Sequence, residues 1–329
     1  MHRTRIIGTG AYLPERRITN DQLVSEFGVD TSDAWIRERT GIGARHMAAP
    51  DEATSDMAAK SSLPALKMSG LDPKDVELII VGTISPDMQF PSASALVQAK
   101  IGATKAACFD VSAACAGSLY ALSIADNFLK TGMYKNALII GSELLTRIVD
   151  WKDRTTCVLF GDAAGAMVLG HDPRPDKGIL STHLHTDGGQ GDLLSIPGGG
   201  SKKPISQEVL DNREMFVKMK GGEVYKTAVR ALESVSREAL EANGYRTSDV
   251  KHVIAHQANL RILEAVMKRL EIPVDKCHLN IEKVGNTSSA SVPLTLDQAN
   301  RQGALHDGDL ILMMAIGGGM SWGSALVRW

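Results

Sequence analysis

The sequence is poor in cysteine, in net charge and in long apolar segments. Its four cysteines include no Cys-x-x-Cys pair, which is the spacing common to zinc and iron–sulfur sites. The formal net charge is −2, so no overall basic character indicates a nucleic-acid partner. No apolar run reaches the ~18 residues that a membrane span needs. We therefore expect a chain without a metal site, a nucleic-acid partner or a membrane association.

The beginning of the chain indicates a cytoplasmic protein. Residues 1–5 lead directly into Ile6 and Ile7, as at the start of a first strand, without the apolar segment of a signal peptide. In a reducing cytoplasm the cysteines remain free thiols. Hydrophobic residues make up 43% and charged residues 22% of the 329 positions. This composition is typical of a globular protein, and the length suits two packed halves.

A degenerate internal repeat divides the chain. Residues 70–82 and 244–256 each show a Gly-led turn followed by a short apolar run, with a helical pattern before the turn. Apolar runs that alternate with longer helical patterns predict α/β units around buried sheets. We therefore expect two duplicated α/β halves, residues 1–172 and 173–329. Residues 173–215 should form loops and short strands between them.

Cys115 is the candidate nucleophile. A predicted strand ends near Val111, small residues follow, and an amphipathic helix should start at about Cys115. A cysteine at a helix N-terminus lies at the positive end of the helix dipole, which in known cases lowers the thiol pKa to roughly 3.5–7.5. We therefore predict a reactive thiolate. A buried structural thiol is the ordinary alternative, and we keep it for Cys108, Cys157 and Cys277.

Two other motifs place polar residues toward the same site. His256 follows a predicted strand, and the carboxyl ends of strands are where α/β proteins usually bind ligands; a structural hydrogen-bonding histidine is the alternative. Asn286 precedes small hydroxyl residues and could be an N-cap. Its helix corresponds, in the repeat, to the helix that begins at Cys115. The duplication therefore predicts that Cys115, His256 and Asn286 lie together.

Three consecutive glycines, residues 317–319, follow another predicted strand. Glycines allow backbone amides to approach a reacting centre closely, and they also suit a tight hairpin; both can hold. A second motif, His183-x-His185-x-Asp187, could suggest a metal site. It lacks a further ligand at a suitable spacing, so we expect no metal there.

Taken together, these motifs resemble the thiolase-fold condensing enzymes, and specifically the β-ketoacyl-acyl carrier protein synthase III family. The resemblance covers essentially the whole chain. It implies an α/β, thiolase-like fold in which the two duplicated halves form a five-layered αβαβα arrangement. The motifs that carry it are Ala-Ala-Cys-Ala-Gly at 113–117, His-Gln-Ala-Asn at 256–259, Gly-Asn-Thr-Ser at 285–288, Gly-Gly-Gly at 317–319, Thr-Ser-Asp-Ala-Trp-Ile at 31–36, Arg-Thr-Gly-Ile at 39–42 and Leu-Phe-Gly-Asp at 159–162.

The resemblance implies a catalytic triad of Cys115, His256 and Asn286. In the family, the cysteine takes a short acyl group, with acetyl expected here, from acyl-coenzyme A. Malonyl-acyl carrier protein then loses carbon dioxide and attacks the acyl-enzyme, which begins fatty acid synthesis. The amides of Cys115, Gly318 and Gly319 would form the oxyanion hole. No metal or redox cofactor is implied.

The resemblance also implies binding residues and a homodimer. Lys226 and Arg261 would dock the acidic acyl carrier protein. Phe90 of a partner subunit would close an acyl pocket that includes Ser118 and Ile316. The coenzyme A contacts would be Thr31, Trp35, Arg39, Arg154 and Asn259.

Other activities share the same triad. A ketosynthase III-like enzyme of specialised metabolism could load starter units, transfer acyl groups or join two acyl chains. A silent carrier-protein-binding subunit would be expected to lack the cysteine or the histidine, and both are present. Ser118 and Ile316 depart from the residues common in the family, so the preferred acyl group stays open.

Overall fold

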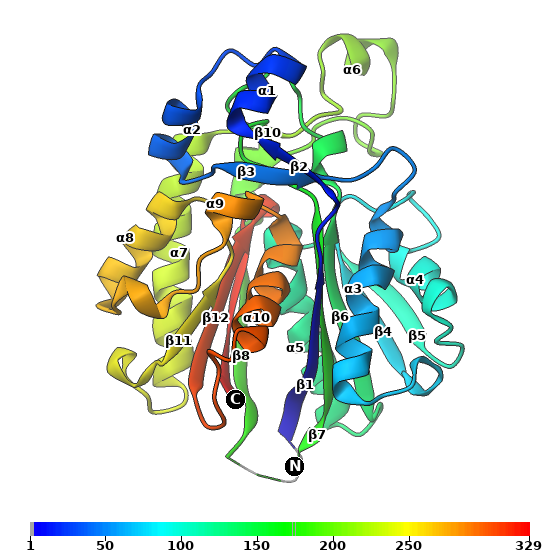
Figure 1. Cartoon of the computed structure of the whole chain (residues 1–329), viewed down its shortest axis with the longest axis vertical. Helices are drawn as coiled ribbons and strands as arrows, with labels where there is room; N and C mark the ends of the chain where they lie inside the picture. Colours follow the sequence, from blue (N-terminus) through cyan, green and yellow to red (C-terminus); the bar gives the residue numbers. More distant parts are fainter. Residues whose placement is uncertain (1–2, 173, 175) are drawn as a thin grey trace.

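The computed structural model describes residues 3–172, 174 and 176–329. Two large sheets form its framework (Figure 1). The first runs in the order β1 (Arg3–Tyr12), β7 (Ala163–Asp172), β6 (Asn136–Glu143), β4 (Leu78–Gly82) and β5 (Ala107–Val111). The second runs in the order β11 (His252–Ala255), β12 (Leu310–Gly317), β13 (Ser321–Arg328) and β8 (Gly178–Thr186). Two small sheets pair β2 (Arg16–Thr19) with β3 (Ala44–Met47), and β9 (Leu194–Ser195) with β10 (Lys218–Met219).

Helices fill the space between the large sheets and cover both outer faces (Figure 1). The central layer is α5 (Gly117–Lys130) with α10 (Ser291–Arg301). The outer layers are α3 (Thr54–Ser69) with α4 (Ala93–Ile101), and α7 (Gly221–Glu241) with α8 (Leu260–Leu270). This is the five-layered αβαβα arrangement predicted from the sequence. The short helices are α1 (Asn20–Phe27), α2 (Asp33–Thr40), α6 (Gln207–Asp211) and α9 (Ile281–Val284).

The duplication is visible in the order of the elements. β6 begins at Asn136 and β12 at Leu310, and each is eight residues long and ends close to the site described below. Gly70 and Gly244 share a left-handed backbone, with φ of 72° and 71°. The boundary between residues 172 and 173 stays a prediction, and residue 173 lies outside the described residues. One expectation was wrong: within 173–215, β8 is a full nine-residue strand of the second sheet.

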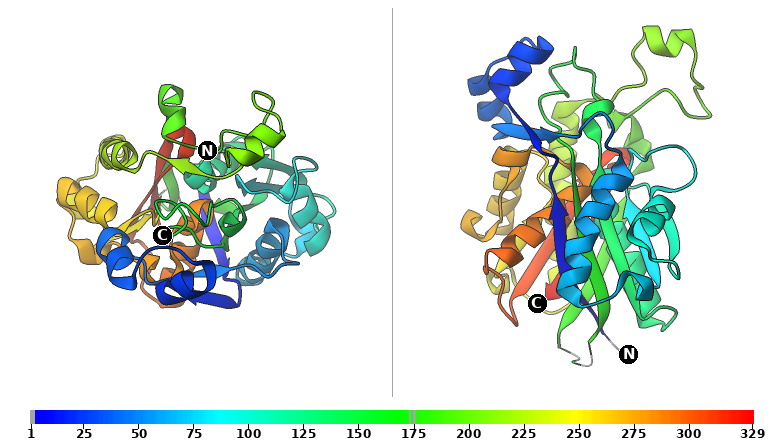
Figure 2. Two further views of the ribbon diagram at one scale, coloured as in Figure 1. Left: turned by 90° about the horizontal axis from the view of Figure 1, so that it is seen from above. Right: turned by 45° about the vertical axis from the view of Figure 1, so that its right-hand side comes forward.

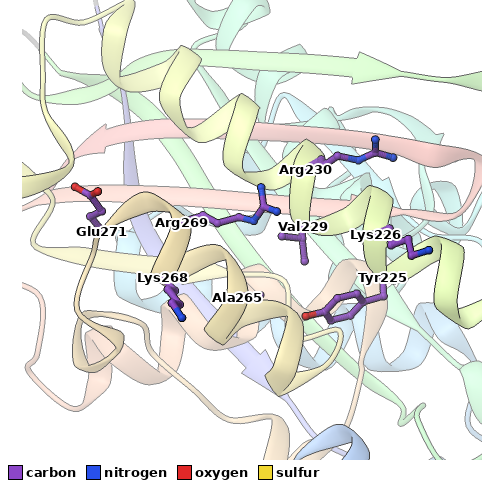
Figure 3. A pocket seen from close by; sticks show the side chains of 8 residues that line it. All are labelled: Tyr225, Lys226, Val229, Arg230, Ala265, Lys268, Arg269 and Glu271. Atoms are coloured by element: carbon purple, nitrogen blue, oxygen red, sulfur yellow. The ribbon is translucent and has the colours of Figure 1, made fainter.

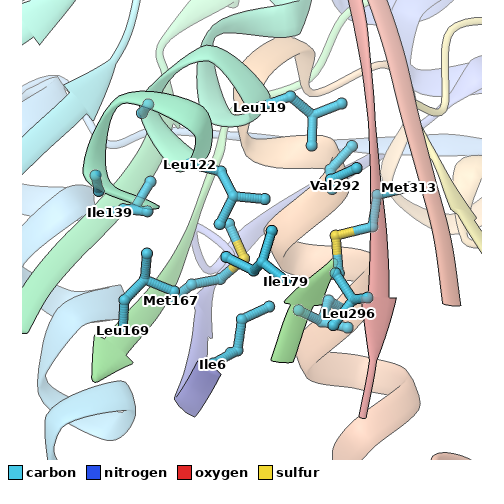
Figure 4. Close-up of a cluster of buried hydrophobic side chains, with 14 of the residues drawn as sticks. Ile6, Leu119, Leu122, Ile139, Met167, Leu169, Ile179, Val292, Leu296 and Met313 are labelled. Carbon is cyan, nitrogen blue, oxygen red and sulfur yellow. The ribbon is translucent and has the colours of Figure 1, made fainter. Parts of the chain in front are cut away.

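The main core lies between the two sheets, around the central helices (Figure 4). Leu119 and Leu122 of α5 and Leu296 of α10 are at most 1% exposed. Burying each such side chain contributes roughly 1.5–3 kcal/mol. The central helices are therefore held between the sheets by apolar burial, and their N-terminal ends are fixed with them.

Glycines let the ends of the central helices press against the first sheet. A Cβ atom at Gly82 would lie 2.6 Å from the carbonyl carbon of Gly117, and one at Gly141 would lie 2.1 Å from the carbonyl oxygen of Ser289. Any larger residue would push the turns before α5 and α10 away from β4 and β6. The glycines thus set the position of Cys115 and of Ser288, which lie in those two turns.

The chain ends lie at one end of the molecule. Helices α1, α2 and α6 lie at the opposite end (Figures 1 and 2). Within the described residues, no helix combines the length and the apolar character that crossing a membrane requires.

Candidate active site

Cys115 lies in a short 3-10 turn, Ala114–Ala116, directly before α5. The corresponding turn before α10, Ser288–Ala290, lies beside it. Ala114 and Ser288 have φ of 45° and 48°, and Met320 has φ of 48°. Left-handed backbone costs a non-glycine residue of order 1–3 kcal/mol, and such strain concentrates at functional sites. All three strained residues line cavities that reach Cys115.

One cavity brings Cys115, His256 and Asn286 together. This entrance cavity has a volume of about 670 Å³, and its walls include Trp35 and Arg39 besides those three residues. Cys115, His256 and Asn286 are 5%, 2% and 6% exposed. They come from the turn before α5, the exit of β11 and the segment before α10. The structure therefore places the three side chains around one space, as the duplication predicted.

Burial governs the protonation of the cysteine and the histidine. It raises the pKa of the Cys115 thiol to about 12, and the nearby Glu143 carboxylate adds to this rise, while a hydrogen bond with Ser288 opposes it. The predicted lowering of the thiol pKa is therefore wrong for the free enzyme, because loss of solvent outweighs the helix end. Burial also lowers the pKa of His256 to about 3, so this imidazole is neutral at physiological pH.

Asn286 is fixed by its backbone and by one end of its side chain. Its backbone N–H donates to the carbonyl oxygen of Leu159 at 2.9 Å, and its own carbonyl accepts from Gly161 N at 3.0 Å. Its Oδ1 accepts from Ser288 N at 2.9 Å. The N-cap role considered for Asn286 is wrong, because Thr287 is the N-cap of the 3-10 turn and Ala290 is the N-cap of α10. The bond from Ser288 N closes a local turn ahead of them instead. It leaves the side-chain Nδ2 as the group able to donate to a ligand.

The glycine loop packs against the nucleophile. A Cβ atom at Gly317 would lie 2.4 Å from the backbone nitrogen of Cys115. β12 and β13 form an antiparallel hairpin around this loop, with Gly317 paired to Ser321. Gly318 and Gly319 line a second cavity at Cys115. Both functions considered for the glycines, a tight hairpin and a close approach to Cys115, fit this geometry.

The second cavity, here called the inner cavity, extends from Cys115 on the side of Gly318 and Gly319. Its volume is about 410 Å³. The apolar side chains in its wall come from segments far apart in the sequence. They are Ile84, Leu145, Phe160, Leu194, Ile196 and Val217.

The three residues predicted to form the acyl pocket are not brought together in this chain. Ile316 lines the entrance cavity instead of the inner one. Ser118 is fully buried, and its hydroxyl has no hydrogen-bond partner within the described structure. Phe90, expected from a partner subunit, is 84% exposed. Five apolar residues of the inner cavity were missed because no local motif marks them: Ile84, Leu145, Leu194, Ile196 and Val217.

The mouth of the entrance cavity carries an aromatic ring with two arginines close to it. The guanidinium groups of Arg39 and Arg154 lie 5.1 Å and 5.2 Å from the ring centre of Trp35. Arg154 also donates to the carbonyl oxygen of Asp30 at 3.0 Å. The neighbouring Thr31 has a buried hydroxyl without a partner in the described structure. Four of the predicted coenzyme A contacts therefore cluster at this end of the molecule, namely Thr31, Trp35, Arg39 and Arg154.

Asn259 has a structural role at the same mouth. Its Oδ1 accepts from Arg261 N at 2.9 Å and caps α8, and its Nδ2 donates to the carbonyl oxygen of Arg39 at 3.1 Å. The side chain thus joins α8 to the end of α2. It lines the entrance cavity with both ends already hydrogen-bonded.

A basic groove begins at the mouth and runs between α7 and α8 (Figure 3). Lys226 lines both this groove and the entrance cavity, and Arg261 lines the cavity mouth. The groove adds basic residues that the sequence analysis did not single out. They are Arg230, Lys268 and Arg269, of which Arg269 pairs with Glu233 at 2.9 Å.

The histidines considered as metal ligands have another partner. Both His183 and His185 contact Glu238, at 3.1 Å and 2.6 Å. Across the described part of the chain, no group of three or more His, Cys, Asp or Glu side chains is arranged to hold a metal ion.

Comparison with known proteins identifies the family. Residues 109–188 match the family model for 3-oxoacyl-[acyl-carrier-protein (ACP)] synthase III, and residues 240–329 match the model for its C-terminal part. The β-ketoacyl-[acyl-carrier-protein] synthase III of Xanthomonas campestris is 52% identical over 326 residues, covering 99% of this chain and 98% of that protein. The corresponding protein of Caldanaerobacter subterraneus is 48% identical over 98% of this chain and 97% of that protein.

Solved structures agree with the sequence comparisons. The 3-oxoacyl-[acyl-carrier-protein] synthase III of Aquifex aeolicus superposes with a TM-score of 0.92 at 45% identity, covering 99% of this chain and 100% of the other. The priming β-ketosynthase of the R1128 polyketide pathway superposes with a TM-score of 0.91 at 34% identity, covering 99% of this chain and 96% of the other. The chain therefore belongs to the β-ketoacyl-[acyl-carrier-protein] synthase III family.

Proposed function

We propose that this chain condenses a short acyl group from acyl-coenzyme A with malonyl-acyl carrier protein. The products are β-ketoacyl-acyl carrier protein, coenzyme A and carbon dioxide, as in the initiation of fatty acid synthesis. The observation that carries the proposal is the pair of cavities that meet at Cys115. One opens past Trp35 and a basic groove, and the other is walled by apolar side chains. A thioester could enter through the first and place its acyl chain in the second.

The first half-reaction transfers the acyl group to Cys115. Its sulfur attacks the thioester carbonyl, the sulfur–acyl bond to coenzyme A breaks, and the proton lost by Cys115 is balanced by the one gained by the leaving thiolate. The oxygen of the tetrahedral intermediate needs hydrogen-bond donors. The amides of Cys115 and of the loop containing Gly318 and Gly319 serve this role in the proposal, since the loop packs against the Cys115 backbone.

The second half-reaction uses His256 and Asn286. Loss of carbon dioxide from the malonyl group leaves an enolate, whose carbon attacks the acyl-Cys115 carbonyl while the Cys115 sulfur leaves. The enolate oxygen is stabilised by donors that keep their protons. A neutral imidazole suits this task, and burial holds the pKa of His256 at about 3. The Nδ2 of Asn286 is the second donor, because Oδ1 is already bonded to Ser288.

Coenzyme A would bind at the arginine-flanked tryptophan. A purine ring stacks well on an indole and under a guanidinium, and Arg39 and Arg154 already occupy those stacking positions. The base would replace one guanidinium, which could then contact phosphate. Thr31 offers a hydroxyl nearby that has no hydrogen-bond partner among the described residues. Asn259 would contribute mainly by holding α8 against α2.

The acyl carrier protein would dock on the basic groove. Lys226 and Arg261 stand at the cavity mouth, and Arg230 and Lys268 extend the positive surface along α7 and α8. An acidic partner held there would point its prosthetic arm toward the entrance cavity.

The reaction requires no metal or redox cofactor, and we place it in the cytoplasm.

A homodimer would complete the molecule. β5 is an edge strand of the first sheet, and its residues are exposed or partly buried. Phe109 of β5 contacts Phe128 edge to face, and Phe128 contacts Tyr134 in the same way. Unpaired edges with adjacent aromatic surface favour strand pairing with a second copy. The exposed Phe90 would then lie against the partner.

The direct test is a panel of acyl-coenzyme A substrates with malonyl-acyl carrier protein, scored for condensed product by mass spectrometry. We expect product from acetyl or another short acyl group. Transfer of the acyl group to an alcohol or amine, or joining of two long chains without malonyl-acyl carrier protein, would contradict the proposal.

A further inference from the structure

Glu143 is a fully buried carboxylate beside the nucleophile, and the proposed reaction does not use it. It ends β6 and has no exposed surface. Its Oε2 accepts hydrogen bonds from Ser85 Oγ at 2.6 Å, Ile84 N at 3.1 Å and Thr83 Oγ1 at 3.2 Å. Its Oε1 accepts from Ser288 Oγ at 2.9 Å. These partners are all neutral. A buried carboxylate with so many donors has a defined position and few ways to move.

Ser288 joins this carboxylate to the active site. Its hydroxyl donates to Glu143, and its backbone N–H donates to Asn286 Oδ1. Ser288 and Cys115 line the same cavity, and Ser288 acts on the pKa of the Cys115 thiol. Its left-handed backbone, with φ of 48°, holds the residue at this junction. A hydroxyl has one proton to donate. When that proton goes to Glu143, the Ser288 oxygen faces Cys115 only as an acceptor.

We propose that Glu143 is a positioning residue that keeps the resting Cys115 as a thiol. By taking the Ser288 proton, the carboxylate makes the Ser288 oxygen the acceptor for the thiol proton, and its own negative charge opposes a thiolate. When the thiol ionises, Ser288 turns its proton to the sulfur. Glu143 then loses one donor and keeps three. The inference uses the proposed function only in naming Cys115 as the nucleophile.

Burial raises the pKa of Glu143, while hydrogen bonds from Ser85, Ile84 and Ser288 favour its charged form. The ionised Glu143 is the form that holds Cys115 as a thiol. Burial and the Glu143 carboxylate both raise the pKa of the Cys115 thiol. His256 lines the entrance cavity with Cys115, and its pKa of about 3 keeps it neutral above about pH 5. The other titratable or charged side chains that line this cavity are Arg39, Tyr225, Lys226 and Arg261. Between about pH 6 and about pH 10, changes in Cys115 reactivity therefore report on the thiol and on Glu143.

The substitution Glu143→Gln tests the role directly. The amide has the size of the carboxylate but no charge, and its NH₂ donates to Ser288, so that the Ser288 proton turns to the sulfur. We expect the pH profile of Cys115 alkylation by iodoacetamide, followed by peptide mass spectrometry, to move about 1 pH unit lower. At a fixed pH below the thiol pKa, alkylation becomes about tenfold faster. The control is Asp126→Asn, a buried carboxyl of α5 that lines neither cavity, and it should not move the profile.

A second substitution shows whether the effect passes through Ser288. In a Ser288→Ala background, the shift caused by Glu143→Gln should fall to less than half. An unchanged profile in Glu143→Gln, or an equal shift with and without Ser288, would overturn the inference. If Glu143→Gln does not fold, Glu143→Asp shortens the side chain away from Ser288 and should give a smaller shift in the same direction. Alkylation needs no acyl transfer, so a failed condensation assay leaves this test intact.

Discussion

His256 and Cys115 are typical of the whole site, because each has the protonation state that burial imposes. The buried imidazole stays neutral and the buried thiol stays protonated. Transfer into a low-dielectric interior disfavours the charged form of either group.

The lowered pKa of His256 predicts an acid-sensitive contribution to stability. The unfolded pKa is the ordinary 6.5 and the folded value is about 3, so the unfolded chain binds a proton in this window and the folded chain does not. The contribution of His256 to the free energy of unfolding is therefore fully present above about pH 6.5. It is lost as the pH falls toward 3, by up to about 1.4 kcal/mol per pH unit.

Denaturant unfolding of the wild type and of His256→Gln, measured between about pH 6.5 and about pH 3, tests this prediction. The variant should lose less free energy of unfolding on acidification than the wild type. Parallel pH dependences in the two proteins would contradict a neutral buried His256.

At the residue scale, the sequence predicted the proximity of Cys115, His256 and Asn286 better than the protonation of the thiol. Cys115, His256 and Asn286 each stand in a recognisable motif, and the duplication relates two of them. The thiol pKa was misjudged because burial depends on residues that pack from both sheets. Glu143 was missed because a single glutamate after an apolar strand gives no local signal, and its partner Ser288 is 145 residues away.

Helices α7 and α8 present the basic groove, and we predict that it sets the affinity for the carrier protein. Reversing two charges, Arg230→Glu with Lys268→Glu, should raise the KM for malonyl-acyl carrier protein at least about tenfold and leave acylation by acyl-coenzyme A nearly unchanged, since rim charges act on the encounter. The effect should weaken as salt is added, because salt screens exposed charges.

Lys74→Glu is the matched control for this groove. Lys74 is exposed in the turn before β4, at the amino-terminal end of that strand. Its reversal changes net charge by the same amount per residue without touching the groove. Equal losses in the control and in the groove variant would show that only overall charge matters.

Strand β5 offers the next test, because we expect it to pair with β5 of a second copy. Phe109→Arg places a charge on the partly buried aromatic surface beside this edge. Sedimentation velocity should show a dimer for the wild type and mainly a monomer for the variant, since charged residues on edge strands oppose pairing. A monomeric wild type, or a variant that stays fully dimeric, would contradict this interface.

At the scale of elements, the strands and helices around the motifs were predictable and the cavity walls were not. Alternating apolar runs and helical patterns indicate β4, β6, β11 and β12. The inner cavity, by contrast, is lined by Leu194 and Val217 from the long connection after β8. That connection has no regular periodicity, and β8 itself was hidden in a region that reads as loops.

The whole molecule can be understood as a duplicated fold that builds one asymmetric site at its pseudo-symmetric centre. The turns before α5 and α10 share their geometry, yet one carries Cys115 and the other carries Ser288 and follows Asn286. Glycines at 82, 117 and 141 let both turns reach the first sheet. The family's motifs make this overall arrangement predictable from the sequence, whereas in the proposed function the acyl preference depends on the shape of the inner cavity.

The most direct measurement is peptide mass spectrometry after incubation with acetyl-coenzyme A, followed by addition of malonyl-acyl carrier protein. We predict an acyl adduct on Cys115 alone, its disappearance when malonyl-acyl carrier protein is added, and no adduct in a folded Cys115→Ala variant. Cys157→Ala, which removes another buried thiol, should still be acylated. An adduct on Cys108, or none on Cys115 with any acyl-coenzyme A, would contradict the role of Cys115 as the acyl-carrying nucleophile.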